Sequence, residues 1–302
     1  MYYNDFIKIY SFLCIFNLSL KIGLTNTINQ KHKTMGNKKY YILMLLGLCL
    51  GTAAMIPEFG ISLFDFSGMV CKLGAIALIV ISLVKQMNEW KSKGAVPTAF
   101  VALAITTSVM AFITIITTLF GIFSWIGTIA GIVSIVLAKK AFNVQWNNAK
   151  SAPLLTIACA TTVVLYEVLN DDAVLMNIAA IVAYTFILLN VPKTGEETLG
   201  KLKIAAILGM VTSVLYLIKV AVIIAWIPYL AFVVMLILAF LGYKKAVPEA
   251  NFLFIGSVIL AVEEVFDFIP VVDIFICPLL MFATITLCML GWIKVLTKME
   301  NA

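Results

Sequence analysis

Residues 153–191 have the sequence PLLTIACATTVVLYEVLNDDAVLMNIAAIVAYTFILLNV. Two apolar runs, 153–169 and 173–191, flank the polar triplet Asn170-Asp171-Asp172. Each run comes close to the roughly 20 apolar residues that a helix needs to cross a lipid bilayer. Asn and Asp are typical of tight turns and can also cap the helix that follows. This stretch therefore predicts a helical hairpin that crosses a membrane twice.

The composition of the whole chain agrees with a membrane protein. Of its 302 residues, 63% are hydrophobic and only 12% are charged, whereas roughly 45–50% and about a quarter are usual in soluble domains. The mean hydropathy is +1.09. These values exclude a disordered chain, a nucleic-acid-binding protein and a soluble protein of two domains. We therefore expect an all-α, polytopic transmembrane helical bundle with the lipid bilayer as its surroundings.

Ten apolar segments follow residue 39, separated by short polar breaks. They lie at 40–56, 67–84, 97–119, 122–138, 153–169, 173–191, 202–218, 222–242, 252–269 and 274–296. Lysine-bearing breaks follow every second segment at spacings of 50–55 residues. This period predicts five tandem helical hairpins of about 50 residues each within one transmembrane domain, 35–302. The hairpin units are expected at 38–95, 96–150, 151–200, 201–249 and 250–302. Evenly spaced loops without a true repeat would give the same pattern.

Charge is distributed unequally between the two sets of breaks. All 21 basic residues are lysines, against 15 acidic residues. Fifteen of the lysines lie before the first segment or in the breaks after every second segment, and the alternate breaks carry acids. Because lysine-rich loops stay in the cytoplasm, we predict cytoplasmic N and C termini, acidic turns that face outward, and residence in the cell (inner) membrane.

Residues 1–34 differ from the rest of the chain. Their apolar run, 9–20, is bracketed by lysines and is short for a span. Met35 begins the motif Met-Gly-Asn-Lys-Lys, directly before the first strong apolar segment. We therefore expect residues 1–34 either to form a weakly ordered arm or to precede the true start of translation at Met35.

Several kinds of active site are missing from the sequence. His32 is the only histidine, so histidine-dependent triads and zinc motifs are excluded. The six cysteines lie inside apolar stretches without a CxxC pair, and neither a P-loop nor a GxGxxG motif is present. We expect no enzymatic activity, no metal site, no cofactor and no nucleic-acid partner.

Acidic residues gather around the last predicted outward turn, as Glu263, Glu264, Asp267 and Asp273. Glu263 and Asp267 are four residues apart and share a helix face. Carboxylates this close repel one another, so the cluster favours uptake of a proton or a shared cation. We take the cluster, with Glu167 and Lys219, as a candidate ion or partner site at the outer face. The alternative is a set of solvated acids where the helix leaves the membrane.

Lys72 and Lys219 are the two lysines on or near the acidic face. Lys72 lies inside the segment 67–84, where an ionisable residue is a candidate functional group, unless its long stem lets the ammonium reach the interface. Pro228 and Pro278 are expected to lie inside their helices, where a proline frees a carbonyl and kinks the helix. Such kinks either shape an outward vestibule or serve packing.

Small and hydroxyl-bearing side chains predict how the helices pack. Small residues let transmembrane helices approach closely, so neighbouring hairpins are expected to meet along Gly127/Gly131 and Ala179/Ala180/Ala183. A threonine stripe is expected to bond to carbonyls one turn earlier in the chain; it consists of Thr107, Thr114 and Thr118.

Two classes of function agree with these features. The first is a non-enzymatic membrane protein whose acidic outward turns bind a protein partner or a toxin, as an immunity-type or accessory protein would. The alternative is a small-solute or ion transporter, coupled to protons or cations, that uses the acidic cluster and Lys72. The first is preferred from the sequence, because the predicted repeats are parallel hairpins and the charges avoid the centre of the membrane.

Overall fold

The computed structural model describes residues 38–56, 66–92, 98–120, 124–145, 151–169, 174–218, 222–266, 269 and 276–301. Within these ranges the chain is entirely helical, which confirms the all-α class. The arm 1–34 and the start at Met35 lie outside the described residues. The ten α-helices of these ranges are α2 (Lys38–Ala53), α3 (Phe66–Ser92), α4 (Thr98–Phe120), α5 (Ser124–Gln145), α6 (Ser151–Val168), α7 (Val174–Asn190), α8 (Gly200–Leu217), α9 (Val222–Ala246), α10 (Asn251–Phe266) and α12 (Cys277–Asn301).

Each predicted apolar segment overlaps one of these helices. Five stretches are long and apolar enough to cross a membrane: Gly68–Asn88, Val174–Thr194, Glu197–Leu217, Ile224–Ala246 and Cys277–Met299. Four other stretches are apolar but shorter: Tyr40–Ala53, Leu103–Ile116, Trp125–Ala138 and Ala152–Val168. A helical membrane protein is therefore supported, while the number of crossings stays a prediction.

Consecutive helices pack in pairs. The most extensive contacts join α2 to α3, α4 to α5, α6 to α7, α8 to α9, and α10 to α12. Between α7 and α8 the chain forms two 3₁₀ turns, Val191–Thr194 and Glu197–Leu199. Gly195 between them has φ 67°, a left-handed conformation that glycine adopts without the steric cost of a side chain.

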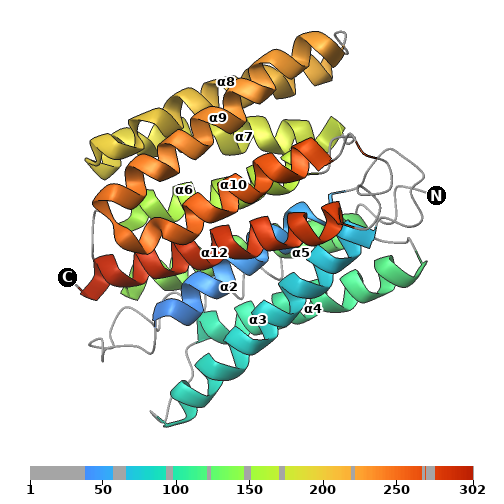
Figure 1. The fold of residues 1–302 in the computed structure, drawn as a ribbon. Coiled ribbons are helices and arrows are strands. Elements are labelled where there is room, and N and C mark those ends of the chain that lie inside the picture. The colour runs from blue at the N-terminus through green and yellow to red at the C-terminus, as the bar shows by residue number, and fades with distance from the viewer. Residues whose placement is uncertain are drawn as a thin grey trace.

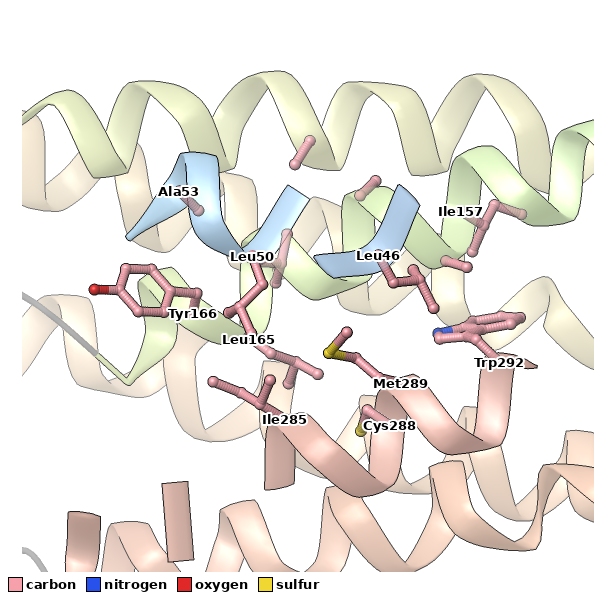
Figure 2. Packing of buried hydrophobic residues seen from close by; sticks show 14 of the residues in the cluster. Leu46, Leu50, Ala53, Ile157, Leu165, Tyr166, Ile285, Cys288, Met289 and Trp292 are labelled. Carbon is pink, nitrogen blue, oxygen red and sulfur yellow. The ribbon is translucent and has the colours of Figure 1, made fainter. Parts of the chain in front are cut away.

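Helices α2, α6 and α12 form the centre of the bundle. Figure 2 shows Leu46 and Leu50 from α2, Leu165 from α6 and Met289 from α12 converging on one another. Nearly every side chain of α2 is buried, as expected of a helix that is apolar all round and lies inside a bundle. Helices α8 and α9 lie on one side of this centre and α3 and α4 on the opposite side (Figure 1).

The five pairs of helices do not follow one another in a simple row. α6 packs on α2, and α12 returns to contact both α2 and α6. The first and third pairs are therefore direct neighbours, and the last pair closes the bundle against both of them.

Small residues lie where neighbouring helices approach closely, as predicted. A Cβ atom at Gly127 would lie 2.6 Å from the Met55 Cε atom, and a Cβ at Gly131 would overlap the Thr52 side chain. These two glycines therefore bring α5 against the end of α2. Ala180 and Ala183 of α7 are buried.

The hydrogen bonds predicted for two threonines form in α4, and the two predicted helix prolines lie at different places in their helices. Thr107 donates to the Leu103 carbonyl at 2.7 Å and Thr114 to the Met110 carbonyl at 2.9 Å, as predicted, while the side chain of Thr118 lies outside the description. Pro228 lies inside α9. Pro278, by contrast, is the second residue of α12. Its missing N–H interrupts no helical hydrogen bond there. The prediction that Pro278 lies inside its helix and kinks it is therefore wrong.

Candidate functional site

Glu167 is a buried carboxylate in the last turn of α6. Its side chain is 7% exposed, and the Ser213 hydroxyl of α8 donates a hydrogen bond to its Oε1 atom at 3.3 Å. Charged side chains are almost never buried to this degree without a partner. The chain brings these two residues together from positions 46 apart in sequence.

The face of α8 turned toward Glu167 consists of small and hydroxyl-bearing residues. Gly209, Thr212, Ser213 and Tyr216 follow the i, i+3, i+4, i+7 spacing of a single helix face. Gly209 has no side chain, and the phenol end of Tyr184 from α7 occupies the space that a Cβ atom would need. Because Gly209 has no Cβ atom, the Tyr184 side chain has room to pack against α8 at this site.

A small cavity lies between these groups. Its volume is about 10 Å³, which is close to the lower limit for holding one water molecule. It is lined by Glu167, Val168, Tyr184, Gly209, Thr212, Ser213, Tyr216 and Tyr229. These residues come from α6, α7, α8 and α9, so the cavity lies where four helices meet. We call this group of residues the Glu167 site.

Tyr184, together with Ser213, is one of the two most deeply buried hydroxyl-bearing residues of the Glu167 site. It is 1% exposed, its ring packs edge-on against Phe232 with 5.8 Å between centroids, and it interacts electrostatically with Glu167. Within the described part of the chain no hydrogen bond reaches its hydroxyl group. This hydroxyl lines the cavity and is available to a molecule bound there.

Tyr229 connects the Glu167 site to a second carboxylate. It lines the cavity from α9, and its hydroxyl donates a hydrogen bond to Oε1 of Glu264 on α10. Glu263, the neighbouring residue, is also buried at 9% exposure, and its backbone carbonyl accepts a weak hydrogen bond from the Cys277 thiol at 3.9 Å. The two adjacent glutamates therefore contact different helices.

The structure unites only part of the predicted site. Tyr229 lines the same cavity as Glu167 and donates a hydrogen bond to Glu264, so it links these two predicted residues. Lys72 is partly exposed on α3, which packs on α2, α4 and α12, and it does not line the cavity. Asp267, Asp273 and Lys219 lie outside the described residues. No three His, Cys, Asp or Glu side chains come together as a metal site among the residues that are described.

Sequence reasoning missed the hydroxyl-bearing half of the site. The spacing of Gly209, Thr212, Ser213 and Tyr216 in an otherwise apolar helix was the signal that could have found it. Tyr184 and Tyr229 carry no such signal, because each is a single aromatic residue in an apolar span. Comparison with protein-family models, with curated proteins and with solved structures gave no match to this chain.

Proposed function

We propose that this chain is a membrane transporter that moves ions, or a small solute coupled to protons or cations, and that Glu167 is the residue that takes up the ion. The observation that carries this proposal is the burial of Glu167 beside a cavity lined by hydroxyl groups from three other helices. Ionisable residues inside a membrane bundle are costly and mark ion pathways and proton relays. Burial disfavours the charged form of a carboxyl group, so it favours uptake of a proton or a cation.

The proposal includes a placement in the membrane. Ten crossings as five hairpins, with both termini in the cytoplasm of the cell membrane, are supported by the match between ten apolar segments and ten described helices. Large apolar side chains on the outside of the bundle also support it. Phe112, Ile227 and Leu279 are 64%, 70% and 65% exposed, and such surfaces suit contact with lipid rather than water.

The partner-binding function preferred from the sequence depends on the outward acidic turns. Those turns, with Asp171, Asp172, Asp267 and Asp273, lie outside the described residues. An immunity-type or accessory role therefore remains a prediction without a structural observation in its favour, whereas the Glu167 site favours transport.

Ion flux into liposomes tests the proposal. Purified protein is reconstituted into vesicles that contain a pH-sensitive dye, and flux is started by a potassium diffusion potential in buffers with and without sodium. Glu167→Gln keeps the shape of the side chain and an acceptor for Ser213 but removes the charge. We expect wild-type flux in at least one buffer and a loss of roughly a hundredfold in the variant, as for other lost proton-transfer groups.

Glu197→Gln is the matched control, because Glu197 is exposed in the 3₁₀ turn before α8 and does not line the cavity. It should retain wild-type flux. Wild-type vesicles that move no ion and no coupled solute would refute transport. Unchanged flux in Glu167→Gln would refute the role of Glu167.

A further inference from the structure

The polar groups of the Glu167 site fit a proton better than a metal cation. A calcium or magnesium ion needs about six oxygen ligands around it. The cavity of about 10 Å³ has room for one water molecule but not for an ion with a hydration shell. Ser213 already donates to one oxygen of Glu167, and Thr212 is bonded to the Leu208 carbonyl at 3.0 Å.

The hydroxyl groups are also placed to conduct a proton. Tyr184, whose hydroxyl no hydrogen bond reaches within the described residues, lines the same cavity as Glu167. Tyr229 lines the same cavity and donates to Glu264. A water molecule in the cavity would lie among lining residues that include Glu167, Tyr184 and Tyr229. A continuous chain of hydrogen bonds would then link the two carboxylates.

From this geometry we infer that the Glu167 site carries protons, and that Tyr229 relays them between Glu167 and Glu264. The inference rests on the proposed function and names the ion that the site takes up. In the transfer, the protonated Glu167 carboxyl gives its proton to the cavity water, which passes one of its own protons to the Tyr229 oxygen. At the same time Tyr229 gives its hydroxyl proton to the Glu264 carboxylate. The net result is one proton moved, with the water and the tyrosine restored.

Tyr229→Phe removes the relaying hydroxyl and keeps the ring. Tyr243→Phe is its matched control, since Tyr243 is buried in the same helix and lies 14 residues away, about 21 Å along the helix axis. In sodium-free vesicles with N-methylglucamine as the balancing cation, we expect proton flux to fall roughly a hundredfold in Tyr229→Phe. Tyr243→Phe should keep the wild-type flux. Glu264→Gln, which removes the proton acceptor, should lose flux as Tyr229→Phe does.

An infrared measurement separates a relay from a purely structural role. The carbonyl stretch of protonated Glu264 is assigned from its loss in Glu264→Gln. That band should move to higher frequency in Tyr229→Phe, because the carboxyl loses the hydrogen bond from the phenol. Tyr243→Phe should leave the band in place, and all variants should elute as the wild type does in size-exclusion chromatography.

The outcomes distinguish this inference from the function on which it rests. Flux that requires sodium would overturn the proton as the carried ion and leave the transport function standing. Proton flux that is equal in Tyr229→Phe and Tyr243→Phe, or unchanged in Glu264→Gln, would overturn the relay. Vesicles in which the wild type moves no ion would overturn both.

Discussion

Glu167 is buried in a site lined mainly by hydroxyl-bearing side chains, and its surroundings determine how it behaves. Moving a carboxylate from water into such an environment costs several kcal/mol unless partners or a proton compensate. Ser213 supplies a hydrogen bond and the phenol of Tyr184 lies nearby, but in the described structure no lysine lines the cavity. Under the proposed function, the proton or cation that Glu167 takes up compensates for the rest of this cost.

Gly209 is a residue at which packing and function can be separated. In Gly209→Ala the new methyl group would overlap the phenol of Tyr184, so Tyr184 must leave its position beside the cavity. We expect a stability loss of about 1–3 kcal/mol, as for other overpacked sites, together with reduced ion flux. Thermal unfolding and vesicle flux measure the two effects.

Gly200→Ala is the control for that substitution. Gly200 begins the same helix, and a Cβ atom there would meet no neighbouring atom within 4 Å. Flux should be unchanged and stability unchanged or slightly higher, since alanine restricts the unfolded chain. Equal effects of the two substitutions would contradict the contact between Gly209 and Tyr184.

Thr284 of α12 is fully buried, and in the part of the chain that is described its hydroxyl has no hydrogen-bond partner. A buried polar group without a partner costs about 1–3 kcal/mol. Thr284→Val replaces the hydroxyl by a methyl group of similar size, so we expect it to raise the free energy of unfolding by about 1 kcal/mol. Thr107→Val is the control: it loses the hydrogen bond to the Leu103 carbonyl and should not stabilise the protein. Denaturant unfolding in detergent measures the free energy of unfolding of both variants.

At the scale of helices, the end of α12 is tied to the connection between α9 and α10. Lys298 of α12 bonds to Glu249 in the 3₁₀ turn Pro248–Ala250 at 2.6 Å. The hydrogen bond from Lys298 holds the pKa of the Glu249 carboxyl below its usual value. A carboxyl whose pKa is lowered by folding stabilises the protein above its ordinary pKa, and this contribution is lost as the pH falls through the lowered value.

The predicted consequence is a small, pH-dependent effect of Glu249→Gln. At neutral pH the variant should melt at a slightly lower temperature than the wild type, because exposed ion pairs contribute little. The difference should shrink in acid below the usual pKa of glutamate and disappear below the lowered pKa of Glu249. A difference that persists or grows in acid would contradict the pairing with Lys298.

The sequence predicted where helices form, but not which helices form the centre. All ten apolar segments became helices because apolar runs of this length are strong signals. The segment 40–56 resembles the other spans in composition, yet α2 is the most enclosed helix. A helix without a polar face gives no sign of which side meets protein and which meets lipid, so its central place could not be read from the chain.

Residues that lie one predicted period apart in the sequence do not have the same surroundings in the structure. Tyr166 and Tyr216 lie one period apart in the sequence. Tyr166 packs in the central core beside Leu50 and Ala53 (Figure 2), whereas Tyr216 lines the cavity. Pro228 and Pro278 match in the same way, but one is inside a helix and the other is in a first turn. Tertiary contacts, which differ for each pair, determine these roles.

At the scale of the whole molecule, the proposed topology predicts which residues reach each side of the membrane. Single cysteines are placed at Lys244, Lys298, Asp171 and Asp273 in a background without the six native cysteines. In intact cells an impermeant thiol reagent should label the two aspartate positions and spare the two lysine positions. The lysine positions should react only after the membrane is opened. Labelling of both sets from outside would contradict ten crossings with cytoplasmic termini.

The central claim is that Glu167 takes up an ion, and chemical modification tests it most directly. A membrane-soluble carbodiimide reacts with protonated carboxyl groups in apolar surroundings, and mass spectrometry then gives the modified fraction of each glutamate. In wild-type vesicles, flux should fall in proportion to the modified fraction of Glu167. Full modification of Glu167 with undiminished flux, or complete loss of flux while Glu167 and Glu264 both stay unmodified, would contradict the claim.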